Sequence, residues 1–207
     1  MINGKYNSFR FLFYFFLLLC YNNPMKKIDF KIIDDKNALL RKECEKVSLP
    51  DEKIKETLLN MVEYLKLSQD DEYAEKNNIR SGVGLAAPQI GINKCFFAIY
   101  YINENDKEIK YGLINPKIIS SSVRKCALKG GEGCLSVKKD HPGYVYRYAK
   151  ITLRAFDIFE NKEIDIVAKN YDAIVLQHEL DHLSGILYYD KIDKSNPFKE
   201  IDNSFLI

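Results

Sequence analysis

The chain has 207 residues, of which 46% are hydrophobic and 29% are charged. This length suits one compact domain, and this composition excludes a disordered or collagen-like chain. Lys and Arg exceed Asp and Glu by two, and Lys5 and Arg10 supply that excess, so the neutral remainder argues against sequence-specific nucleic-acid binding, which needs a basic face.

Residues 1–24 form a hydrophobic N-terminal extension, with an unbroken apolar run at 11–21 behind Lys5 and Arg10. That order of charge and apolar residues is typical of a signal peptide, but the run is shorter than the ~20 residues that span a bilayer, and no small-residue cleavage site follows it. We therefore predict that translation starts at Met25. Residues 25–207 would then be a single domain without stable membrane association, and a targeting leader is the alternative.

Turn residues and apolar periodicity predict the elements of this domain in chain order. Residues 51–67 repeat apolar positions at helical spacing, 68–80 form a polar surface insertion, and 95–101 form a strand. Residues 151–159 and 163–167 alternate as two strands around a turn at 160–162. A second helix is expected from Tyr171 to Ser184, with Asn170 as its cap and Gly185 as its stop. Two helices among antiparallel strands predict an α+β fold.

The five cysteines are an odd number and include no CxxC pair. This pattern fits neither a disulfide framework nor a zinc ribbon, and it predicts reduced thiols in the cytoplasm. Cys44, Cys95 and Cys126 are interpreted as small buried residues.

The second helix contains His178-Glu179-Leu180-Asp181-His182, which is a His-Glu-x-x-His pattern. The i, i+4 spacing places both imidazoles on one helical face, where they can bind one metal ion, and Glu179 can take a proton from water activated there. The flanking residues are apolar, which favours a buried helix over one with surface histidines. His141 lies in an Asp-His-Pro-Gly turn and is expected to face solvent.

A catalytic metal site usually has three protein ligands and one open position. No other histidine is suitably placed, and Cys134 in Glu132-Gly133-Cys134-Leu135-Ser136 is the candidate third ligand. The simpler interpretation of Cys134 is a small buried residue, but its position between glycines favours a ligand.

A third segment, Gly82-Val83-Gly84-Leu85-Ala86-Ala87-Pro88-Gln89, lacks the context of a dinucleotide-binding motif. Its glycines allow a peptide to lie against the backbone. The carboxamide of Gln89 can donate a hydrogen bond to an oxygen that becomes negative.

Together these three segments resemble the signature motifs of the peptide deformylases, and the likeness covers about residues 26–194. The insertion at 68–80, Val137 and the segment 188–193 resemble the second bacterial type, common in low-GC Gram-positive bacteria. The resemblance implies antiparallel sheets around a central helix that carries the histidines. The tail from Asn196 to Ile207 lacks the long terminal helix of the other type, which puts ribosome docking through such a helix in doubt.

The resemblance implies a role for each matching residue. Cys134, His178 and His182 are metal ligands, Glu179 is the general acid and base, and Gln89 with the Leu135 amide forms the oxyanion hole. The substrate backbone and the methionine side chain are expected to contact Val83, Gly84, Glu132, Gly133, Tyr171, Ile174 and Val175.

The expected reaction removes the formyl group from the N-terminal formyl-methionine of nascent proteins and releases formate. One Fe(II) per chain is expected, with Zn(II), Ni(II) or Co(II) as alternatives. N-formyl-methionyl nascent peptides are the expected partners, and any contact with the ribosome is expected to be transient. The alternatives are a zincin-type metallopeptidase, which usually takes a later third ligand, and an inactive metal-binding module, which needs neither Glu179 nor Gln89.

Overall fold

The computed structural model describes residues 30–48 and 51–207. The predictions about the extension 1–24 and the start at Met25 fall on residues outside this part of the chain.

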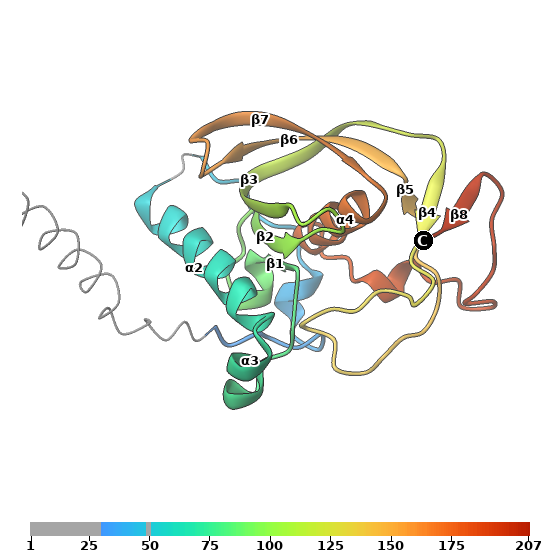
Figure 1. Cartoon of the computed structure of the whole chain (residues 1–207), viewed down its shortest axis with the longest axis horizontal. Coiled ribbons are helices and arrows are strands. Elements are labelled where there is room, and N and C mark those ends of the chain that lie inside the picture. The colour runs from blue at the N-terminus through green and yellow to red at the C-terminus, as the bar shows by residue number, and fades with distance from the viewer. Residues whose placement is uncertain (1–29, 49–50) are drawn as a thin grey trace, which may run out of the picture.

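The described residues form two β-sheets with a buried helix between them (Figure 1). The helices are α2 (Glu52–Ser68), α3 (Asp71–Asn77) and α4 (Asn170–Leu183), with short 3-10 turns η1 (Ala38–Arg41), η2 (Ala87–Ile90) and η3 (Tyr188–Lys191). The strands are β1 (Gly84–Ala86), β2 (Phe96–Ile102), β3 (Glu108–Ser121), β4 (Lys125–Ala127), β5 (Arg147–Tyr148), β6 (Lys150–Asp157), β7 (Lys162–Lys169) and β8 (Ser204–Leu206). The predicted α+β class is confirmed.

The larger sheet is antiparallel, in the order β1-β2-β3-β6-β7, and the smaller has the order β5-β4-β8. The sequence predicted antiparallel pairing throughout, but β8 runs parallel to β4, with Cys126 opposite Phe205. This parallel pair joins segments about 80 residues apart, a separation at which local sequence patterns carry no pairing signal.

Strand β2 explains why its sequence is apolar without alternation. Phe97, Ile99 and Tyr101 pack on the side of α4, while Phe96, Ala98 and Tyr100 pack on the side of α2. A strand that is buried on both faces carries apolar side chains on both, so its sequence does not alternate between apolar and polar residues. The sheet therefore lies between the two long helices. Strand β1 is an edge strand of this sheet and lies against α4.

The predicted polar insertion at 68–80 lies largely at the surface, although Ser68 is buried as the last residue of α2, and it contains the additional helix α3, which the sequence interpretation missed. The Asp70 side chain caps this helix by accepting a hydrogen bond from the Tyr73 N–H at 2.8 Å, and Asn78 ends it with a φ of 52°. None of the residues of α3 is buried, so no apolar periodicity marks it.

Helix α4 begins and ends close to the predicted residues. Asn170 was expected to be the cap, but it is the first residue of the helix, with a φ of 50°, and Lys169 precedes it as the cap. Gly185 has a φ of 71° just after the end of the helix. A Cβ atom there would come within 2.7 Å of the Arg41 backbone, so this turn requires glycine both for its φ and for its contact with the N-terminal segment.

Candidate metal and catalytic centre

The three sequence motifs meet at one cavity of about 230 Å³. Its lining comes from residues 80–84, which lead into β1, from Leu128 and residues 132–135, and from α4. Segments about 40 residues apart along the chain thus face a common space.

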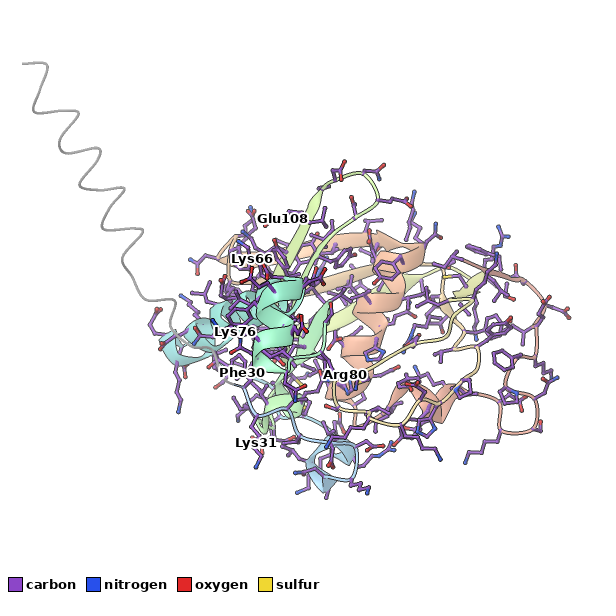
Figure 2. The ribbon with its side chains drawn as sticks, turned by 60° about the horizontal axis from the view of Figure 1, so that its bottom comes forward. Phe30, Lys31, Lys66, Lys76, Arg80 and Glu108 are labelled. Carbon is purple, nitrogen blue, oxygen red and sulfur yellow. The ribbon has the colours of Figure 1, made fainter. Side chains whose placement is uncertain are left out.

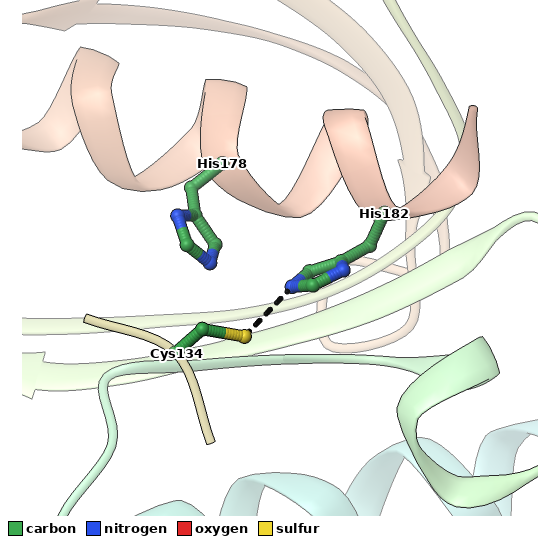
Figure 3. Close-up of side chains that lie close together, drawn as sticks. All are labelled: Cys134, His178 and His182. Carbon is green, nitrogen blue, oxygen red and sulfur yellow. Dashed lines mark hydrogen bonds between the residues drawn. The ribbon is translucent and has the colours of Figure 1, made fainter. Parts of the chain in front are cut away.

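Cys134, His178 and His182 gather at the inner end of this cavity, and one ligand atom from each lies within 4.8 Å of the other two. Figure 3 shows both imidazoles projecting from α4 toward the Cys134 sulfur. The Cys134 Sγ lies 3.3 Å from the His182 Nε2. Because a thiol and two imidazoles converge in a mostly buried place, the residues present fit a divalent transition metal ion.

A buried ion network holds the ring of His178. The Glu132 carboxylate lies 2.8 Å from the His178 Nδ1 and accepts two hydrogen bonds from Arg147, at 2.6 and 2.8 Å. Arg147 also donates to Asp181 at 2.7 Å. With Nδ1 engaged by Glu132, the His178 Nε2 is left to face Cys134, and this orientation by a carboxylate is common at metal-binding histidines.

The same contacts shift the pKa values of these groups. Burial alone would raise the pKa of Glu132, but the hydrogen bonds from Arg147 and His178 outweigh it and lower the pKa to about 2. Burial lowers the pKa of His178, whereas its hydrogen bonds to Cys134 and Glu132 raise it to about 10. Burial and the neighbouring His178 charge lower the pKa of His182. The sequence interpretation missed Arg147 and Asp181, since neither stands in a motif that marks a buried ion pair.

Glu179 points from α4 toward Gly84 on β1. A Cβ atom on Gly84 would overlap its carboxylate and lie 2.7 Å from the Glu179 Cδ, so a larger residue at this position would displace the Glu179 side chain. Glu179 is 4% exposed, and burial raises the pKa of its carboxyl to about 7. Its Oε2 atom is buried without a partner among the described residues. This carboxylate is therefore available to a molecule that enters the cavity.

Gln89 is held so that its amide nitrogen faces the cysteine. Its Oε1 accepts a hydrogen bond from the Ala86 N–H at 2.8 Å, while its Nε2 donates to the Cys134 Sγ at 3.4 Å and to the Ser136 Oγ at 3.2 Å. Leu135 follows the cysteine directly and lines the same cavity. Ser136 was not singled out from the sequence, although it belongs to the same motif.

The residues expected around the substrate all line this cavity. They are Val83, Gly84, Glu132, Gly133, Tyr171, Ile174 and Val175. Glu132 differs from the others because its carboxylate is committed to Arg147 and His178. Arg80 and Leu128 line the cavity as well and were missed.

His141 is only partly exposed to solvent, less than expected. It is half-buried, and its ring stacks on Tyr189 with the centroids 4.3 Å apart, outside the metal-ligand cluster. Cys44 and Cys126 are buried and Cys95 is half-buried, all as free thiols. Cys20 lies outside the described residues.

Comparison with known proteins identifies the family. A family model described as polypeptide deformylase matches residues 30–198. The chain belongs to the polypeptide deformylase family. It is 49% identical to peptide deformylase 2 of Bacillus subtilis over 177 residues, which are 85% of this chain and 96% of the relative. Identity to peptide deformylase 2 of Geobacillus stearothermophilus is 46% over the same shares of both chains.

Similarity to solved structures supports the same family assignment. The Thermotoga maritima peptide deformylase has a TM-score of 0.62 at 29% identity, covering 79% of this chain and 97% of that chain. The Met-Ala-Ser-bound class I type b peptide deformylase of Acinetobacter baumannii has a TM-score of 0.61 at 26% identity, covering 79% and 98%. The two peptide deformylase 2 relatives come from Bacillus subtilis and Geobacillus stearothermophilus, in agreement with the predicted likeness to deformylases of Gram-positive bacteria.

The activity is therefore that of a metal-dependent deformylase, which removes the N-formyl group from the N-terminal formyl-methionine of nascent proteins. This result displaces the zincin-type peptidase and the inactive metal-binding module. Within residues 30–48 and 51–207, no helix has both the length and the apolarity that crossing a membrane requires.

In this deformylase, replacing Cys134 with serine should lower the metal content well below one ion per chain, because a hydroxyl is a poor substitute for a soft thiolate. Elemental analysis after purification measures this loss. Cys126→Ser is the matched control, since Cys126 is also a buried free thiol but lies outside the ligand cluster. Equal metal content in the two variants would show that Cys134 only packs in the core.

Strand β8 contributes Phe205 to a hydrophobic cluster that borders the deformylase cavity. Phe205 and Leu128 both pack against the buried cluster of Cys126, Ala149 and Ile174, and Leu128 and Ile174 also line the cavity. We expect Phe205→Ala to raise KM for formyl-Met-Ala-Ser by roughly 5-fold, about 1 kcal/mol, with little change in kcat, because the wall loosens while the catalytic groups stay in place. The control is Phe198→Ala, since that ring is 53% exposed and packs on Tyr144 away from the cavity. Unchanged KM would show that the wall needs no support from β8.

Proposed function

We propose that Cys134, His178 and His182 hold one Fe(II) ion and that Glu179, Gln89 and the Leu135 amide carry out deformylation beside it. The observation that carries this proposal is the convergence of these side chains in one cavity, with Glu179 buried next to the ligand cluster. When bound, the cation supplies Lewis-acid chemistry, which polarises the formyl oxygen and acidifies water. Zn(II), Ni(II) and Co(II) are the alternatives for the same donor set.

Glu179 accepts the proton from the attacking water and later donates it to the departing amine nitrogen. Its pKa of about 7 suits both steps, because an acid and base works best when its pKa lies near the working pH. Gln89 donates from Nε2, and Leu135 donates from its backbone N–H, to the oxygen that becomes negative. The Ala86 N–H fixes the Gln89 carboxamide in the orientation that this donation needs.

The substrate is proposed to lie between residues 82–84 and Gly133. Its backbone pairs with Val83, Gly84 and Gly133, and its methionine side chain enters among Tyr171, Ile174 and Val175. Support comes from the shared cavity and from the tripeptide Met-Ala-Ser bound to the Acinetobacter relative. Glu132 would contribute by orienting His178 more than by touching the methionine, since both of its oxygens already have partners.

We place this reaction in the cytoplasm, where nascent formylated chains emerge, and expect contact with the ribosome to be transient. The segment after Asp193 ends in strand β8, which is built into the smaller sheet, and does not project from the domain as a helix. Sedimentation with ribosomes at low and moderate salt would test this contact.

Release of formate from formyl-Met-Ala-Ser, together with elemental analysis, tests the proposed site. We expect kcat/KM for acetyl-Met-Ala-Ser to be lower by about 100-fold or more, because an added methyl group beside Gly84 and Glu179 displaces the carbonyl, and misplacement of ~1 Å has an effect of this size. Comparable kcat/KM for the two peptides would contradict the proposed arrangement and indicate an open amidohydrolase site.

A further inference from the structure

A second cavity, of about 290 Å³, adjoins the catalytic cavity. Arg80 and Leu135 line both cavities, so the two spaces meet at these side chains. The second cavity extends from there to α3 and to Phe30, and Figure 2 shows Phe30 and Arg80 on this side of the molecule. None of the roles assigned above uses this space.

The proposed substrate lies along the segment that runs from Gly84 back to Arg80. Its formyl end is at Gly84, so its later residues extend toward Arg80. Gly84 lies against Glu179, where the formyl group reacts, whereas Arg80 lies four residues earlier at the second cavity. Between them, Leu135 packs against Gly82, where a Cβ atom would come within 2.8 Å of it. An extended peptide advances ~3.3 Å per residue. A peptide that follows this wall therefore reaches Arg80 with about its fourth or fifth residue.

The lining of the second cavity is cationic. Among the described residues, Arg80 and Lys138 are the charged side chains of this lining, which includes no carboxylate. Arg80 is held in place by a hydrogen bond of 2.8 Å from its Nη1 to the Val137 carbonyl. The acidic residues of α3 stand outside the lining, while Tyr73 and Asn77 of that helix face it. Charge complementarity therefore favours a carboxylate over an ammonium group at this cavity.

We propose that this second cavity is a subsite for the fourth or fifth residue of the nascent formyl peptide, and that it favours Asp or Glu there. The inference rests on the proposed function, because it takes the formyl group to react beside Glu179. It makes Arg80 and Lys138 specificity-determining residues that act at a distance from the bond that is broken.

The experiment compares formyl-Met-Ala-Ser-X-Ala and formyl-Met-Ala-Ser-Ala-X peptide amides, with X as Glu, Gln or Lys. Each kcat/KM is divided by the value for formyl-Met-Ala amide measured with the same protein. We expect a preference for Glu over Lys of about 5-fold at one of these positions, the size expected for one or two exposed ion pairs, and we expect it to shrink at high salt. Formyl-Met-X-Ser peptides should show no such preference.

The variants are Lys138→Glu and Lys138→Gln, with Lys139→Glu as the matched control. Lys139 is the next residue, is exposed, and does not line the cavity. Lys138→Glu should abolish the preference, Lys138→Gln should reduce it, and Lys139→Glu should leave it unchanged. Equal rates for Glu and Lys at both positions, or equal effects of the changes at 138 and 139, would overturn the subsite. Failure to release formate even from formyl-Met-Ala amide would instead overturn the proposed catalytic roles.

Discussion

Glu179→Gln should lower kcat for formyl-Met-Ala-Ser by roughly 100-fold or more while the protein keeps its fold and its metal. A carboxamide has nearly the same size and cannot move a proton at this position, and loss of a positioned acid and base has an effect of this size. The substitution leaves Cys134, His178 and His182 unchanged. Formate release, metal content and thermal unfolding measured on one preparation separate the proton-transfer role from metal binding.

The control for this variant is Glu163→Gln. Glu163 lies on β7 with its side chain 66% exposed, so the same chemical change there should leave kcat within error. If Glu179→Gln retains more than about a tenth of the wild-type kcat, then another group carries the proton. If it loses its metal, then Glu179 takes part in building the ligand cluster.

Arg147→Met should lower the free energy of unfolding by about 3–5 kcal/mol, the effect of removing one partner from a buried ion network. The Arg147 side chain is 1% exposed and bonds both oxygens of Glu132 as well as Asp181. Its loss leaves the Glu132 carboxylate buried with only His178 as a partner, while Asp181 keeps Lys191 at 2.7 Å. Urea unfolding followed by circular dichroism measures the change.

Arg154→Met offers a matched control, because Arg154 makes a comparable two-bond contact with Asp165, at 2.6 and 2.7 Å, but is 38% exposed. Solvent screens that pair, and its loss should lower stability by about 1 kcal/mol or less. Equal losses in the two variants would mean that burial of the Arg147 network does not set its contribution to stability.

The destabilisation by Arg147→Met should also depend on pH. The fold lowers the pKa of Glu132 to about 2, from an ordinary value of about 4.3. A carboxyl group of this kind stabilises the fold above its ordinary pKa, and that contribution is lost as the pH falls toward the lowered value. The difference in stability between wild type and variant should therefore narrow between about pH 4 and pH 2.

The elements that the sequence predicted well are those with local signals. Apolar spacing marked α2, and Asn170 and Gly185 with the apolar residues between them marked α4. Alternation marked β6 and β7, and the i, i+4 histidines marked one face of a helix. The association of Cys134 with those histidines followed from ligand chemistry together with the family resemblance, and the structure brings the three side chains together.

The features that were missed depend on contacts between distant segments. Arg147 stands between two tyrosines, in a setting that does not distinguish a buried ion pair from an exposed cation. Its partners lie 15 and 34 residues away, and only the folded chain brings them together. The parallel pairing of β8 and the exposed helix α3 were missed because neither has an apolar period of its own.

The buried carboxylate of Glu179 serves catalysis but lowers the stability of the fold. Burial disfavours the charged form of this side chain and raises its pKa to about 7, so the ionised carboxylate weakens the fold relative to an apolar group of similar shape. Selection for a durable fold alone would favour Leu or Met at this position of the most enclosed helix. A Glu179→Met protein should thus be inert, and without metal it should be harder to unfold than the metal-free wild type, because the wild-type chain keeps a buried carboxylate that its activity requires.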